Sequence, residues 1–288
     1  MISFEVSESK RESSLSVALV RSLFCGLPEK ERRMAVIVSA SDETYRDKFV
    51  YGGVLASLRY WEKIFAPRWE RDVLDGAPRI PFLHMTDIRS PKWRESMGIS
   101  ELEADRRVEN AVQILCKRKE PVWIGFEFGH ECFNDTLMQR IQMKSGVLKP
   151  FVADYFGFMG YAYCVLRFVR QMYPEVRKVD FLVERNGEVT KNLPEFYENF
   201  DPFLREMGAA DYIGLLGDII PGGKDRTPLQ AADVLCWYLR RAREQTLVGI
   251  DLERYERLRK KKHVIGGLGN ESLTELQREL KAQIAATQ

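Results

Sequence analysis

The stretch that decides the fold is MAVIVSASDET, from Met34 to Thr44. Its apolar run is typical of a buried strand, and it ends in two adjacent carboxylates, Asp42 and Glu43. Because Asp is a common turn residue, Asp42 could serve only to end the strand. A second apolar run, FVYGGVLAS over residues 49–57, follows across a short polar loop. The two runs therefore predict an antiparallel hairpin, with a bulge or a close backbone approach at Gly52 and Gly53.

Apolar strands and amphipathic helices alternate along the rest of the chain. The predicted helices cover residues 58–74, 100–119, 150–172, 193–207 and 227–244. The predicted strands are PVWIGFEF (121–128), KVDFLVERNG (178–187) and DYIGLLGDII (211–220), and RIPFLHMTDI (79–88) is predicted as a short extended segment. This alternation predicts an α/β protein in which a mixed sheet is flanked by helices.

The last of these helices has a clear start signal in the sequence TPLQ. Thr227 is the expected N-cap, Pro228 occupies the first helical position, and Gln230 would complete a capping box. No linker interrupts residues 34–245, which we predict as a single domain. Residues 1–33 are expected to form an N-terminal extension, and residues 246–288 a basic, helical C-terminal tail.

Composition places the chain among ordinary globular proteins. The 44 basic and 42 acidic side chains nearly cancel, so overall charge neither favours nor excludes a nucleic-acid partner. The five cysteines are irregularly spaced and odd in number, which favours reduced thiols and a cytoplasmic protein over a disulfide framework or a zinc ribbon. The most apolar long stretch, YFGFMGYAYCVL (155–166), falls short of the ~20 residues that span a bilayer. It predicts a core helix rather than a membrane segment.

Three carboxylates occupy comparable places in the predicted fold. Asp42 and Glu184 end strands, and Asp233 lies in the first turns of the last helix, on one face with Trp237 and Arg240. Each has an ordinary structural explanation: a turn, a solvated strand end, or an exposed helix acid. Carboxylates that cluster repel one another unless a cation lies between them, and oxygen ligands suit Mg²⁺ or Mn²⁺. Two such ions can hold the attacking water and the leaving oxygen of a phosphodiester.

The motifs SASDET, FLHMTDI, FLVERN and PLQAADVL occur in this order over roughly residues 34–245. In this order they resemble the domain of unknown function 3800 family, which is regarded as having a ribonuclease-H-like fold. That family typically shows a strand ending in D-E-S-G, a second motif with a histidine, a later strand ending in an acid, and an L-Q-x-A-D helix. The chain departs from this pattern at Thr44 and Tyr45, which replace the serine and glycine, and at Glu184, where Asp is common.

The resemblance implies a set of functional positions. These are the first-strand acids Asp42 and Glu43, the histidine His84, the later strand acid Glu184, and the helix pair Gln230 and Asp233. In ribonuclease-H-like nucleases such acids bind two divalent metal ions. Two basic side chains on the same helix, Arg240 and Arg241, are candidate contacts to a phosphate backbone, although they could equally lie on a solvated helix face.

Two hypotheses follow. The first is a Mg²⁺- or Mn²⁺-dependent nuclease or phosphodiesterase acting on nucleic acid. In it Asp42, Glu184 and Asp233 bind metal, Glu43 and His84 assist, and Gln230, Arg240 and Arg241 contact substrate. The second is a non-catalytic ribonuclease-H-like module that binds or scaffolds, in a defence or mobile-element context. The departures at Thr44 and Tyr45 and the near-neutral charge motivate this alternative.

Overall fold

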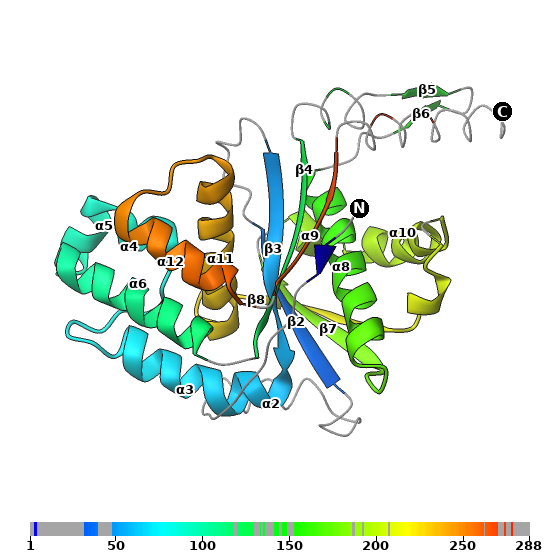
Figure 1. Cartoon of the computed structure of the whole chain (residues 1–288). Coiled ribbons are helices and arrows are strands. Elements are labelled where there is room, and N and C mark those ends of the chain that lie inside the picture. Colours follow the sequence, from blue (N-terminus) through cyan, green and yellow to red (C-terminus); the bar gives the residue numbers. More distant parts are fainter. Residues whose placement is uncertain are drawn as a thin grey trace.

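The computed structural model has a central mixed sheet with helices on both faces (Figure 1). It describes residues 3–4, 32–39, 48–117, 120–129, 133, 135, 141–143, 146–148, 153–185, 188–191, 193–206, 208–261, 263–269, 274 and 278. The strands are β1 (Ser3–Phe4), β2 (Arg32–Ser39), β3 (Lys48–Ser57), β4 (Val122–Gly129), β7 (Lys178–Glu184), β8 (Leu216–Gly222) and β9 (His263–Leu268), with a separate pair β5 (Ile141–Met143) and β6 (Gly146–Leu148). The α/β class predicted from the sequence is confirmed.

The helical elements connect these strands. Before β4 they are α2 (Leu58–Tyr60), η2 (Trp61–Phe65), α3 (Ala66–Trp69), η3 (Glu70–Leu74), α4 (Met85–Arg89), α5 (Pro91–Ser96) and α6 (Glu101–Cys116). After β6 they are α8 (Ala153–Met172), α9 (Glu188–Lys191), α10 (Leu193–Glu206), η4 (Ala210–Tyr212), α11 (Thr227–Arg243) and α12 (Gly249–Arg259). No described helix is both long and apolar enough to cross a membrane.

The strand order in the large sheet is β1-β9-β4-β3-β2-β7-β8. The predicted hairpin is confirmed, because β2 and β3 pair antiparallel with Met34 opposite Ala56 and Val38 opposite Gly52. β4 continues the antiparallel arrangement on the other side of β3. β7 and β8 run parallel to β2, so the carboxyl ends of β2, β7 and β8 lie at the same edge of the sheet.

Two apolar cores lie on opposite faces of the sheet, and β3 contributes to both. Its side chains alternate between the faces, as the two-residue period of a strand requires. Val50 and Val54 belong to the core under α6 and α11, whereas Phe49, Tyr51 and Leu55 belong to the core under α8 and α10. Figure 1 shows the same division, with α6, α11 and α12 on one side and α8 and α10 on the other.

Three local expectations were wrong. The extended segment predicted for residues 79–88 ends at His84, because Met85–Arg89 form the helix α4. The N-cap of α11 is Arg226 rather than Thr227, and its side chain makes no capping hydrogen bond because a guanidinium has no acceptor. The amide group of Gln230 is bound to Trp69, Leu83 and Lys224 instead. The strand predicted at residues 211–220 begins only at Leu216.

The segment that we expected to be a helical C-terminal tail also contributes to the sheet. After α12, residues 263–268 form β9, which pairs parallel with β4 from Trp123 to Phe128. Ser3 and Phe4, in the expected N-terminal extension, pair in turn with β9. Val264 of β9 is fully buried, so this strand shares the core of the neighbouring strands.

Candidate functional site

Asp233 lies on α11 close to the carboxyl ends of β2 and β7. One turn before it, Leu229 Cδ1 and the β7 side chain Leu182 approach Gly222 at the end of β8. Three residues after it, Cys236 lies against Gly52, and its Sγ would be 2.8 Å from a Cβ at that position. Because Gly52 pairs with the penultimate residue of β2, α11 carries Asp233 across the edge where β2 and β7 end. The close approach predicted at the paired glycines is confirmed at Gly52.

The Asp233 carboxylate is held by the start of α4. The Met85 backbone N–H donates to Asp233 Oδ2 at 2.6 Å, and His84 Nε2 lies 3.8 Å from Oδ1. The side chain is only 17% exposed. Burial raises the pKa of Asp233 above its usual value, while His84, the Met85 N–H and Lys224 act in the opposite direction. A cation bound beside this carboxylate would further stabilise its ionised form.

His84 lies between two carboxylates at the N-terminal end of α4. Its Nδ1 is 2.9 Å from Asp87 Oδ2, and its Nε2 faces Asp233 Oδ1. The Lys224 ammonium lies 3.5 Å from the same Nε2. This lysine comes from the loop PGGKDR directly before α11, so two segments distant in the sequence, the start of α4 and the region of α11, meet here. A ring fixed in this way can orient a water molecule or donate to a phosphate oxygen.

Gln230 connects the segments that surround His84 and Asp233. Its side chain is 2% exposed, and its Oε1 accepts hydrogen bonds from Trp69 Nε1 at 2.7 Å and from the Leu83 N–H at 2.9 Å. Its amide Nε2 donates to the Lys224 carbonyl oxygen at 2.9 Å. Gln230 therefore ties the segment that carries His84, and the loop that carries Lys224, to the first turn of α11.

Glu184 is the last residue of β7 and is half-buried. It pairs in register with Gly222, and its carbonyl oxygen accepts a hydrogen bond from Thr190 Oγ1 at 3.3 Å. Asp42 and Glu43 lie outside the described residues, beyond the end of β2 at Ser39. Within the described part of the chain, no three His, Cys, Asp or Glu side chains form a group that could hold a metal ion. The structure thus brings together His84, Gln230 and Asp233, and leaves Glu184 separate from them.

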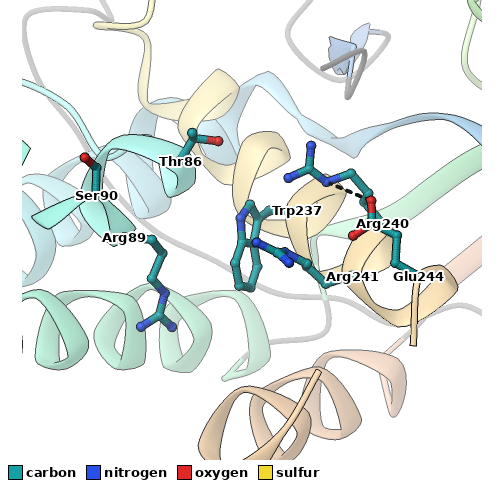
Figure 2. A pocket seen from close by; sticks show the side chains of 7 residues that line it. All are labelled: Thr86, Arg89, Ser90, Trp237, Arg240, Arg241 and Glu244. Carbon is teal, nitrogen blue, oxygen red and sulfur yellow. Dashed lines mark ion pairs between the residues drawn. The ribbon is translucent and has the colours of Figure 1, made fainter. Parts of the chain in front are cut away.

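Arg240 and Arg241 lie further along the same helix and line a pocket of about 470 Å³ (Figure 2). Arg240 is mostly buried, and its Nε is 3.8 Å from Glu244. The pocket adjoins α4, which supplies Thr86, Arg89 and Ser90 to its other wall. Both predicted arginines therefore face a shared pocket rather than open solvent.

Sequence reasoning missed two of the residues that surround these side chains, Lys224 and Arg89. Lys224 lies in the loop before α11, where no sequence pattern pointed to a functional residue. Arg89 directly follows the segment 79–88 that we predicted as extended, so its place in a helix facing α11 could not be inferred. Trp237 was placed on the face of Asp233 by helical periodicity, and that spacing was the available signal for a pocket on this face.

Comparisons with protein-family models, with curated proteins and with solved structures gave no match for this chain. The resemblance to the domain of unknown function 3800 family thus rests on the motifs themselves.

Proposed function

We propose that the chain is a divalent-metal-dependent phosphodiesterase that cleaves nucleic acid, built on a ribonuclease-H-like fold. The observation that carries this proposal is the position of Asp233. Its carboxylate is mostly buried beside His84, at the sheet edge where β2 and β7 end. Strand ends of this kind are where α/β proteins usually assemble their sites.

The topology of the sheet supports the fold assignment. Three strands in antiparallel succession, β2, β3 and β4, are followed by β7 and β8, which are parallel to β2 and lie on its other side. Helices cover both faces, with α8 on one and α11 on the other. The motif SASDET begins with Ser39, the last residue of β2, and PLQAADVL lies on α11, which packs against β2 and β3.

The proposal assigns a hard cation to this edge of the sheet. Asp233 and Asp42 would hold Mg²⁺ or Mn²⁺ through carboxylate oxygens, and Glu184, which no described contact joins to Asp233, would complete the set from the end of β7. Such ions polarise the phosphodiester and lower the pKa of a bound water molecule. Asp233 suits this role because its carboxyl is mostly buried, and a cation beside it would stabilise the ionised form that burial disfavours. Asp42 provides the second carboxylate, and the proposal depends on it.

His84 and Lys224 act toward the substrate. Asp87 lies 2.9 Å from His84 Nδ1, and the other ring nitrogen, Nε2, faces Asp233. The Lys224 ammonium, beside that nitrogen, provides positive charge for a phosphate oxygen. Glu43 has a supporting role, and Gln230 keeps both segments in place through its three hydrogen bonds.

A cleavage assay tests this proposal. The purified protein is incubated with labelled single- and double-stranded DNA and RNA, with Mn²⁺, Mg²⁺ or EDTA. We expect metal-dependent cleavage of at least one substrate, and its loss in Asp233→Asn and Asp42→Asn. Asp211→Asn, which changes an exposed acid in η4, is the matched control and should retain full activity. Cleavage that survives Asp233→Asn would overturn the assignment.

One observation favours the non-catalytic alternative. Asp233 Oδ2 accepts the Met85 N–H and Oδ1 faces His84, so protein groups already compensate both carboxylate oxygens. A binding or scaffold module could retain such an arrangement without metal. Calorimetry discriminates the two, because a catalytic site binds Mn²⁺ at millimolar concentration with an affinity that Asp233→Asn reduces, and the module does not bind it.

A further inference from the structure

The pocket between α4 and α11 adjoins the candidate site but is separate from it. Asp233 lies at one end of a partly buried face of α11, and Trp237, Arg240 and Arg241 follow on that face. Seven or eight residues at the rise of an α-helix correspond to about 10–12 Å along its axis. A group bound at Arg241 is therefore distinct from one bound at Asp233.

The pocket lining is strongly basic. Of its described lining residues, three are arginines and only Glu244 is acidic. Arg89 donates through Nη1 to Asp105 on α6 and through Nη2 to Asp251 on α12. These two contacts hold its guanidinium between the two helices. Arg241 donates to Thr246 Oγ1 at 3.4 Å and, among the described residues, forms no ion pair. Its Nε is buried without a hydrogen-bond partner.

Trp237 holds the guanidinium groups in place. The Arg241 guanidinium lies 5.3 Å from the centre of its ring, and that of Arg89 lies 5.6 Å from it. In the view of Figure 2, Trp237 stands between these two side chains. Cation–π contacts of this kind orient a guanidinium while leaving its charge uncompensated. With its ring engaged by arginines, Trp237 serves the pocket as a platform for cations rather than as a stacking surface for a base.

Hydroxyl groups complete the opposite wall. Thr86 is exposed at the start of α4, and Ser90 Oγ accepts the Trp93 N–H at 3.4 Å, which leaves its own O–H hydrogen to donate. Guanidinium and hydroxyl donors around one cavity are the set that proteins use for phosphate oxygens.

We propose that this pocket binds a phosphate group of the nucleic-acid strand other than the one attacked at Asp233. The inference rests on the proposed function and deepens it: the substrate is a polynucleotide long enough to reach both places. Arg241 and Arg240 bind the phosphate oxygens, Thr86 and Ser90 donate from the other wall, and Trp237 is a positioning residue.

Binding without cleavage provides the first test. In EDTA, the affinity of the protein for a fluorescent single-stranded oligonucleotide is measured by anisotropy across a salt series. Loss of a charge-assisted contact in Arg241→Gln should weaken binding by about tenfold or more. It should also lower the slope of log affinity against log salt by about 0.7, the value for one phosphate contact to a single strand. Arg241→Lys, which retains the charge, should recover part of the loss.

The matched control is Arg59→Gln. Arg59 is an exposed arginine after β3, at the opposite edge of the sheet from Asp233. If Arg241→Gln and Arg59→Gln bind the oligonucleotide with equal affinity, the proposal that this pocket binds a phosphate is wrong. Competition is then measured with unlabelled oligonucleotide and with polyphosphate of equal charge. If polyphosphate competes equally well, the pocket binds anions in general, and the assignment of a nucleic-acid ligand is wrong.

A second measurement separates this inference from the proposed function. Bis(p-nitrophenyl) phosphate has a single phosphate, so with Mn²⁺ its hydrolysis should require Asp233, and the rise in KM caused by Arg241→Gln should be larger for an oligonucleotide than for this small substrate. Asp233→Asn should keep its affinity in EDTA. If no substrate is cleaved but Arg241→Gln still weakens binding, the pocket stands and the nuclease does not. If cleavage requires Asp233 and Arg241→Gln changes neither KM nor binding, the nuclease stands and the pocket does not.

Discussion

Gln230 is the residue whose replacement most sharply tests how the candidate site is built. Gln230→Met keeps the length and approximate volume of the side chain but removes every hydrogen bond that it makes. The buried Trp69 Nε1–H and the Leu83 N–H then lose their acceptor, and the Lys224 carbonyl loses its donor. Because the site is 2% exposed, water cannot readily replace these partners.

The magnitude follows from the two buried donors. Each unsatisfied donor costs about 1–3 kcal/mol, so we expect Gln230→Met to lower the free energy of unfolding by about 2–6 kcal/mol. For a chain of this size that corresponds to a fall in Tm of about 3–10 °C. Gln113→Met is the matched control, because Gln113 is exposed on α6 and should change stability by less than about 0.5 kcal/mol.

A double-mutant cycle measured by urea unfolding identifies the cause. Trp69→Phe removes one of the two donors, so Gln230→Met in that background should cost less than in the parent, by about 1 kcal/mol or more. If Gln230→Met costs no more than Gln113→Met, or if the two changes are additive, Gln230 does not hold the segment before His84 in the way described.

Two further predictions concern the dependence of stability on pH. Burial raises the pKa of Asp233 in the folded protein above its usual 3.8, so its ionised form lowers the stability of the metal-free protein once the pH rises above that value. In EDTA at pH 7 the Tm of Asp233→Asn should therefore be higher than that of the parent protein, and the difference should disappear near pH 4. A Tm below that of the parent at pH 7 would contradict this prediction. Arg257 and Arg254 lower the pKa of Glu109 from 4.5 to about 2, so its contribution is complete above pH 4.5 and is lost as the pH falls toward 2. Glu109→Gln should lower stability by about 2 kcal/mol at pH 7 and flatten the acid limb of the unfolding curve, whereas a parallel acid limb would refute the assignment.

The parts of the fold that local patterns determine were predicted from the sequence. The apolar runs of β2 and β3 gave the hairpin, and the long aromatic helix gave α8. The helix predicted at residues 100–119 begins as α6 after Ser100, whose Oγ accepts the Glu103 N–H at 3.1 Å.

The failures have a common cause, which is competition from distant partners. TPLQ has the composition of a capping box, but the Gln230 amide binds Trp69 and Leu83, more than 140 residues earlier in the chain. β9 was missed because its sequence, HVIGGL, becomes a strand through pairing with β4. Neither partner can be identified from a local window of sequence.

The candidate site divides in the same way. Helical periodicity placed Asp233, Trp237 and Arg240 on one face, and that face lines the pocket and the candidate site. The approach of α4, which brings His84 and Arg89 to α11, depends on tertiary packing and was not predicted. The metal-binding roles of Asp42 and Glu184 stay predictions.

The most direct test of the central claim is the rate at which an oligonucleotide is cleaved with Mn²⁺, compared between the parent protein and Asp233→Asn. The proposal predicts cleavage that EDTA abolishes and that Asp233→Asn slows by at least about 100-fold, because the variant loses a metal-binding carboxylate at the reacting centre. Asp211→Asn should cleave at the parent rate. Equal rates for the parent and Asp233→Asn, or no metal-dependent cleavage of any DNA or RNA substrate, would contradict the assignment.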